Sequence, residues 1–145
     1  RAFSIFIFNS QNELLLQQRA FSKYHSGGLW TNTCCSHPRD NETVSEAAIR
    51  RLKEEMGMTC HLEKKFDFIY RAKMINNLFE HEFDHVLFGF SDTKPKINST
   101  EVESFKYSSL EEISIDISVN PHLYTEWFKI CFNEVVLRKK ELHVQ

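Results

Sequence analysis

The chain has 145 residues, of which 41% are hydrophobic and 26% are charged, and its formal net charge at pH 7 is −2. These values predict one domain, residues 1–145, with enough apolar side chains for a core. The 18 basic and 20 acidic residues nearly cancel, so we expect no general attraction to nucleic acid and only local recognition of anions. No apolar run reaches the roughly 20 residues of a membrane helix and no signal-peptide pattern is present, which predicts a cytoplasmic protein without membrane contact.

The four cysteines are expected to be reduced thiols. Two of them are adjacent, and a chain of this size needs no disulfide framework. Their spacing also lacks the paired Cys-x-x-Cys elements of a structural zinc site. They are Cys34, Cys35, Cys60 and Cys131.

Two strand-like runs at the N-terminus, residues 2–8 and 14–18, flank a turn-forming segment at 9–12 and predict a hairpin. Residues 19–38 follow, and we expect them to form one long loop. This segment contains a Gly-Gly pair, several cations and the adjacent cysteines. Because a long loop in a compact domain is more often functional or disordered than incidental, it is the first place to look for a site.

A helix is predicted after this loop. Thr43 and Glu46 have the spacing of a capping box, and Gly57 ends the helix. An apolar stripe with helical spacing supports this prediction. Its members are Ala48, Ile49, Leu52 and Met56.

The rest of the chain alternates strands and helices. Strands are predicted at residues 66–72, 78–90 and 104–107, the first two joined by a turn at Asn76-Asn77. A helix is predicted to start near Ser109, and a longer helix to run from residue 121 to about 142.

Three carboxylates share one face of the strand at 78–90 with apolar side chains further along. They are Glu80, Glu82 and Asp84. One interpretation is a solvated strand end. The other is a metal or proton-transfer site, because carboxylates two residues apart on a strand project in parallel towards one ligand.

Residues 30–38, Trp-Thr-Asn-Thr-Cys-Cys-Ser-His-Pro, place a thiol two residues before an imidazole. Cys35 offers a nucleophile or acid/base group, and His37 offers a metal-binding nitrogen. The alternative is a small buried hydrophobe beside a structural histidine. The acidic and basic helix that follows suggests a metal and an anionic substrate near the thiol.

The sequence resembles a known family. Residues 36–58 resemble a degenerate Nudix box, with Ser36 in place of the opening Gly and Arg51 in place of a Glu. Together with residues 14–19, 30–38 and 79–82, this pattern resembles the type I isopentenyl-diphosphate isomerases over nearly the whole chain. The resemblance implies an α/β fold, a Nudix-type mixed sheet sandwiched between helices. It also implies the interconversion of isopentenyl and dimethylallyl diphosphates in isoprenoid precursor biosynthesis.

Moving a double bond by one position requires a proton delivered at one carbon and another removed two carbons away, so an acid and a base must flank the substrate. The resemblance implies that these are the Cys35 thiol and the Glu82 carboxylate, with the Tyr70 hydroxyl in the acid relay. It implies that Cys34 is a structural neighbour. The indole of Trp127 would stabilise a carbocation-like species by a cation–π interaction; alternatively, Trp127 is a core residue of an amphipathic helix.

The resemblance also implies two metal ions. One, Zn²⁺, Mn²⁺ or Mg²⁺, would bind His37, Glu80 and Glu82. Two further histidine ligands of the family come from an N-terminal segment that this sequence starts one residue too late to contain, so we expect a trimmed chain or an incomplete site. A Mg²⁺ ion on the diphosphate would be held by Glu55 and the backbone carbonyl of Cys35.

Three cations are implied as diphosphate-binding side chains: Arg19, Lys23 and Arg51. Their alternatives are ordinary solvated charges and, for Arg51, an i,i+4 pair with Glu55. Arg51 replaces a metal-binding carboxylate and favours isomerisation over hydrolysis. A Nudix pyrophosphohydrolase and a catalytically silent Nudix-fold binding module remain the alternatives, and we expect a monomer or weak dimer with a small isoprenoid diphosphate as its partner.

Overall fold

The computed structural model describes the backbone of residues 1–73 and 79–144 and the side chains of residues 1–71 and 82–142. The turn predicted at Asn76-Asn77 lies outside the described residues. The strands are β1 (Ala2–Phe8), β2 (Glu13–Arg19), β3 (Trp30–Thr31), β4 (Cys34–Ser36), β5 (Glu63–Lys73), β6 (Phe79–Phe90) and β7 (Val102–Ser109). The helices are α1 (Val44–Met56), α2 (Leu110–Val119), the 3₁₀ turn η1 (Pro121–Leu123) and α3 (Glu126–Val144).

The described strands form one mixed sheet in the order β3-β2-β1-β6-β5, with β4 paired to β1 and β7 paired to β2. β1 runs parallel to β6 from Ala2 opposite Asp84 to Phe8 opposite Phe90. β1 and β2 pair antiparallel at Phe8 and Leu14, beside the predicted turn. Beyond that point the two strands take different partners, so the predicted hairpin is opened: β1 pairs with β4 and β6, and β2 pairs with β3 and β7.

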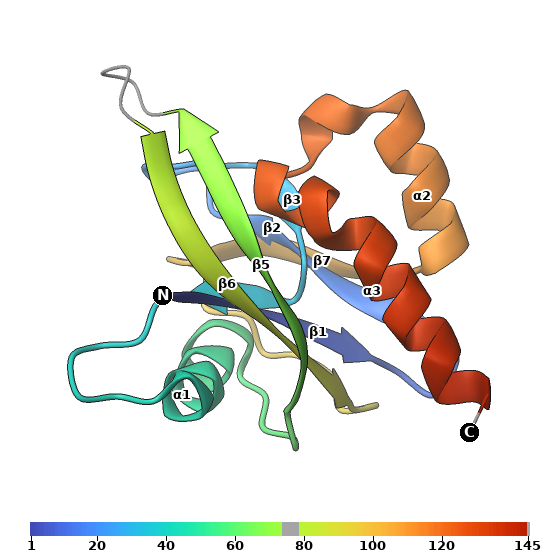
Figure 1. The fold of residues 1–145 in the computed structure, drawn as a ribbon, viewed down its shortest axis with the longest axis horizontal. Coiled ribbons are helices and arrows are strands. Elements are labelled where there is room, and N and C mark those ends of the chain that lie inside the picture. Colours follow the sequence, from blue (N-terminus) through green and yellow to red (C-terminus); the bar gives the residue numbers. More distant parts are fainter. Residues whose placement is uncertain (74–78, 145) are drawn as a thin grey trace.

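The sheet lies between helices, as predicted. Figure 1 shows α1 on one side of the sheet and α2 and α3 on the other. β1 is buried on both faces, and its side chains alternate between the two layers. Phe3, Ile5 and Ile7 pack with α1, whereas Phe6 and Phe8 pack with α2 and α3. A strand buried on both faces explains why residues 2–8 are almost uniformly apolar.

Local signals set the limits of α1. The side chain of Thr43 accepts a hydrogen bond from the backbone N–H of Glu46, and the carboxylate of Glu46 accepts one from the backbone N–H of Thr43, which completes the predicted capping box. Gly57 ends the helix in the left-handed region, with a φ of 62°. The prediction of this helix is confirmed.

The structure corrects three element predictions. The segment 19–38 is not one loop, because it contains the short strands β3 and β4. The strands predicted at 66–72 and 104–107 are longer and run over Glu63–Lys73 and Val102–Ser109. The last helix starts at Glu126 and not at residue 121, because Tyr124 is extended and forms a bridge with Trp30.

Two further expectations can be compared with the structure. None of the helices in the described part of the chain is both long and apolar enough to cross a membrane. All four cysteines are unpaired, as predicted.

Candidate active site

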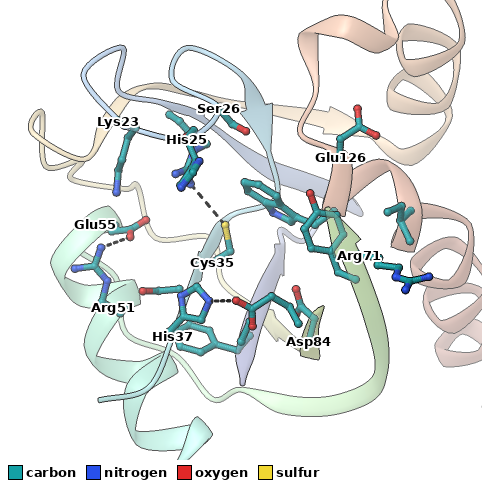
Figure 2. Close-up of a pocket in the computed structure, with 18 residues that line it drawn as sticks. Lys23, His25, Ser26, Cys35, His37, Arg51, Glu55, Arg71, Asp84 and Glu126 are labelled. Carbon is teal, nitrogen blue, oxygen red and sulfur yellow. Dashed lines mark hydrogen bonds and ion pairs between the residues drawn. The ribbon is translucent and has the colours of Figure 1, made fainter. Parts of the chain in front are cut away.

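A cavity of about 770 Å³ opens beside the N-terminal end of β1. Its walls come from β1, the segment after β2, β4, α1, β5, β6 and α3 (Figure 2). Each predicted site residue with a described side chain lines it: Arg19, Lys23, Cys35, His37, Arg51, Glu55, Tyr70, Glu82 and Trp127. The side chain of Glu80 lies outside the described residues. The structure therefore gathers residues that are widely separated in the sequence around one cavity.

The sheet places Cys35 and Glu82 on either side of β1. Cys35 lies on β4, opposite Ser4 of β1, and Glu82 lies on β6, which pairs with the other edge of β1. β6 pairs with β1 from Asp84 opposite Ala2, so Glu82 lies two residues beyond the start of β1. The thiol and the carboxylate nevertheless line the same cavity, and a small alkene bound there can meet both.

The thiol of Cys35 is held in its protonated form. Burial raises its pKa to about 12, with Arg19 opposing the rise and the carboxylates of Glu55 and Asp84 adding to it. Arg19, the cation that favours the thiolate, has its Nη1 atom 3.9 Å from Sγ of Cys35. The neighbouring Cys34 is fully buried in the core beside α1, which fits the structural place expected for it.

Glu82 meets two of its predicted neighbours. Its Oε1 lies 2.7 Å from Nε2 of His37, an exposed side chain at the edge of the cavity. Tyr70 lies directly opposite Glu82 in the β5–β6 ladder. Cross-strand partners have neighbouring side chains, so the hydroxyl expected in the acid relay and the carboxylate belong to the same part of the site.

Asp84 is one of the three strand carboxylates that the sequence left open as a solvated strand end or a metal or proton-transfer site. It is 4% exposed, lines the cavity, and accepts a hydrogen bond at Oδ2 from Ser4 Oγ at 3.1 Å. Oδ1 has no hydrogen-bond partner among the described residues. Burial raises the pKa of Asp84 to about 7, and the negative charge of Glu82 contributes to the rise. The alternation with Glu80 and Glu82 was the signal for this residue.

Trp127 combines the two interpretations left open by the sequence. It packs against the core cluster beside α3, and it also lines the cavity. The start of α3 is fixed by a hydrogen bond from Thr125 N to Trp30 O and by one between the hydroxyls of Thr31 and Thr125 at 2.8 Å. The indole ring meets Tyr70 edge-on at 6.2 Å, and the Arg19 guanidinium lies 5.3 Å from its centre.

The indole N–H of Trp127 is buried and has no acceptor of standard hydrogen-bond geometry in the described part of the structure. Its dipole nevertheless lies close enough to Cys35 to favour the thiolate, although burial and the charged neighbours affect that pKa more strongly. The aromatic face and the thiol therefore bound the same part of the cavity.

At one end of the cavity, Figure 2 shows two cations, Lys23 and Arg51, close to the carboxylate of Glu55. Arg51 makes the i,i+4 ion pair with Glu55 that the sequence allowed, and it also bonds Glu54 Oε1 at 2.8 Å. Lys23 is paired with Glu101 rather than simply solvated. These contacts show where the charges lie; the roles assigned to them remain predictions.

Glu55 is deeply buried, at 3% exposure, and its two oxygens are both engaged. Gln17 Nε2 donates to Oε1 at 3.1 Å and to the backbone oxygen of Thr33 at 2.8 Å, while Arg51 donates to Oε2. Gln17 lies on β2, its side chain is buried, and it was not singled out from the sequence. It orients a carboxylate that a Mg²⁺ ion would need.

The donor groups at the first predicted metal site are consistent with a divalent cation. His37 and Glu82 are in contact, and imidazole and carboxylate together suit Zn²⁺ or Mn²⁺. Among the side chains that the structure describes, no three His, Cys, Asp or Glu residues come close enough together to hold a metal ion. The third predicted ligand on this chain, Glu80, belongs to the part not described.

Comparisons with known proteins agree with this fold. The model of the NUDIX domain family matches residues 1–128. Among solved structures, the MutT protein from Methanosarcina mazei Go1 superposes with a TM-score of 0.77 at 18% identity, over 97% of this chain and 92% of that one. DR0079 from Deinococcus radiodurans gives a TM-score of 0.70 at 21% identity, over 83% and 73%. At these identities the structures show the fold alone.

Curated relatives are much more similar. Isopentenyl-diphosphate Delta-isomerase 2 of Aromatoleum aromaticum is 52% identical over 136 residues, which cover 94% of this chain and 72% of that protein. The isopentenyl-diphosphate Delta-isomerase of Pectobacterium atrosepticum is 50% identical over 135 residues, covering 93% and 75%. The chain belongs to the Nudix superfamily and, within it, to the family of type I isopentenyl-diphosphate Delta-isomerases.

Proposed function

We propose that this chain interconverts isopentenyl and dimethylallyl diphosphates. The observation that carries the proposal is one cavity with a thiol and a carboxylate on opposite sides of β1 and a cluster of cations at one end. The names of relatives at about 50% identity support the same activity. A diphosphate bound at the cationic end would direct its short hydrocarbon chain between the two proton-transfer groups.

Glu82, with the Tyr70 hydroxyl, exchanges a proton with one carbon of the substrate, and Cys35 exchanges a proton with the carbon two bonds away. In one direction Glu82 gives a proton and Cys35 takes one; in the other direction the roles reverse. The double bond moves by one position, and no atom is lost or gained overall. The protonated state of Cys35 suits donation, and Arg19 stabilises the thiolate that remains.

Trp127 stabilises the cationic species between the two transfers. Its ring borders the same part of the cavity as Cys35 and Tyr70. A desolvated cation over an indole face gains about 2 kcal/mol or more. The core packing of the ring keeps that face in place.

Arg19, Lys23 and Arg51 are proposed to bind the diphosphate, with Glu55 holding the Mg²⁺ ion that accompanies it. His37, Glu80 and Glu82 are proposed to hold the second divalent metal, Zn²⁺, Mn²⁺ or Mg²⁺. When bound, such cations neutralise phosphate charge and increase the acidity of the carboxylate. Glu55 is already buried and oriented by Gln17, so it is ready for an oxygen-seeking cation once its ion pair with Arg51 opens.

A Nudix pyrophosphohydrolase is the second candidate. Such an enzyme needs several carboxylates free to hold cations around the diphosphate. Here Arg51 stands where the Nudix pattern has a metal-binding Glu, and its guanidinium pairs with Glu54, which leaves fewer carboxylates for cations and disfavours hydrolysis. A silent binding module is the third candidate, and it offers no reason for a thiol and a carboxylate to face the same cavity.

The proposal is tested by following isopentenyl diphosphate with proton and phosphorus NMR in the presence of the chain, Mg²⁺ and added Zn²⁺ or Mn²⁺. We expect dimethylallyl diphosphate without release of phosphate. Release of phosphate or pyrophosphate would instead support the hydrolase. Binding without any turnover, also in a chain extended at its N-terminus to include the family's histidines, would support the binding module.

We also propose the cytoplasm as the compartment of this reaction. Four unpaired cysteines, one of them placed in the proposed site, suit a reducing environment.

A further inference from the structure

Lys23 and Arg51 reach the cavity from two different elements, the segment after β2 and helix α1. Both contact the same carboxylate, that of Glu101, which lies just before β7. Arg51 Nη2 is 3.4 Å from Glu101 Oε1, and Lys23 Nζ pairs with Oε2. Glu101 is not among the described residues that line the cavity, so it bridges the two cations from behind.

The backbone holds Glu101 firmly. Its carbonyl oxygen accepts a hydrogen bond from Ala20 N at 3.1 Å, which ties it to the segment that carries Lys23. Its own N–H donates to Asn98 O at 2.9 Å, and Asn98 N donates to the backbone oxygen of Glu55 at 2.9 Å. The turn that bears Glu101 is therefore anchored both to the end of β2 and to the last turn of α1.

The carboxylate is ionised at neutral pH. Burial alone would raise the pKa of Glu101, but Lys23 and Arg51 together hold it below its usual range. Each cation also keeps donors for another partner, because an ammonium has three N–H groups and a guanidinium has five. A contact with Glu101 consequently orients the two cations without using up their capacity to bind an anion.

We propose that Glu101 is a positioning residue that holds Lys23 and Arg51 together as one diphosphate-binding pair. This inference rests on the proposed function, since it concerns the same anion site. Arg51 divides its N–H groups among Glu54, Glu55 and Glu101. If Glu55 turns to a Mg²⁺ ion, Glu101 still fixes the guanidinium, and the cation does not have to be ordered again when the diphosphate arrives.

The competing view is that Glu101 is only a negative charge near an anion site. In that case its removal would strengthen anion binding, because like charges repel. The two views predict opposite signs, so the affinity for an anion distinguishes them without any measurement of catalysis.

The test is calorimetric titration with inorganic pyrophosphate of the wild-type chain, Glu101→Gln, Glu101→Asp and Glu103→Gln. Glu103 is exposed on β7, and Glu103→Gln removes the same charge as Glu101→Gln, so it is the matched control. We expect Glu101→Gln to weaken pyrophosphate binding about fivefold, the value for about 1 kcal/mol of lost ordering. Glu101→Asp keeps the charge and should recover part of this loss, whereas Glu103→Gln should bind within about twofold of wild type.

A double-mutant cycle with Lys23→Met shows whether Glu101 acts through Lys23. We expect Glu101→Gln to cost less in the Lys23→Met background than in the wild type. Unchanged or tighter pyrophosphate binding by Glu101→Gln would overturn the inference about Glu101. A loss of affinity that is the same in both backgrounds and in Glu101→Asp would also overturn it. Neither result would contradict the proposed diphosphate site. A wild-type chain that does not bind pyrophosphate would instead contradict the proposed diphosphate site.

Discussion

The substitution Asp84→Asn tests the electrostatics of the cavity. Asp84 is nearly fully buried, one of its oxygens has no partner among the described residues, and its pKa is raised to about 7 from its usual value of 3.8. A rise of about three pKa units corresponds to about 4 kcal/mol. The folded state binds the proton of Asp84 more tightly than the unfolded state does. The corresponding contribution to the free energy of unfolding is therefore present below about pH 4 and is lost as the pH rises towards 7.

Asn cannot ionise, and its amide still accepts from Ser4 Oγ. We therefore expect Asp84→Asn to increase the free energy of unfolding at pH 8 by up to about 4 kcal/mol and to change it little at pH 4. The measurement is urea denaturation at both pH values with a chelator present, so that no cation neutralises the carboxylate. Asp40→Asn, at an exposed position, is the control. An equal change for Asp84→Asn at both pH values would refute the argument.

The remaining predictions concern catalysis, metal and the fold. Cys35→Ala and Glu82→Gln should each lower kcat by about 10²–10⁴-fold because a proton-transfer group is lost, whereas Cys34→Ala should keep most of the activity; equal losses from both cysteine changes would mean that the thiol is wrongly assigned. Chelation should abolish isomerisation and added Mg²⁺ with Zn²⁺ or Mn²⁺ should restore it, while full activity after exhaustive chelation would contradict the metal sites. Gly57→Ala should lower stability by about 1–2 kcal/mol or more in thermal denaturation, because φ is 62° and the new Cβ would lie 2.6 Å from Lys96 O; an unchanged Tm would contradict this.

Local signals made parts of the fold predictable. Thr43, Glu46 and Gly57 fix α1 through contacts within a few residues, and such contacts are visible in the sequence. The pairing of β1 was not predictable in the same way. Its parallel partner β6 lies about 80 residues away, as the bond between Ser4 and Asp84 illustrates, and nothing in the local pattern shows that β1 and β2 separate after their turn.

The same distinction holds for the site. The resemblance of the sequence motifs to those of the isomerase family indicated Cys35, Glu82 and Trp127. The structure places these residues around one cavity. Glu101 was not singled out, because a Glu in a polar connection has no distinguishing spacing and gains its place only when β7 pairs with β2. The start of α3 was missed for a related reason, since the bridge to Trp30 interrupts the helix from outside.

The most direct test of the account is proton NMR of isopentenyl diphosphate incubated with the metal-loaded chain in D₂O. Two proton transfers by side chains in exchange with solvent predict dimethylallyl diphosphate with deuterium in its new methyl group, and no such product with Glu82→Gln. Dimethylallyl diphosphate without deuterium, or the same labelled product from Glu82→Gln at the wild-type rate, would contradict the proposed roles of Cys35 and Glu82.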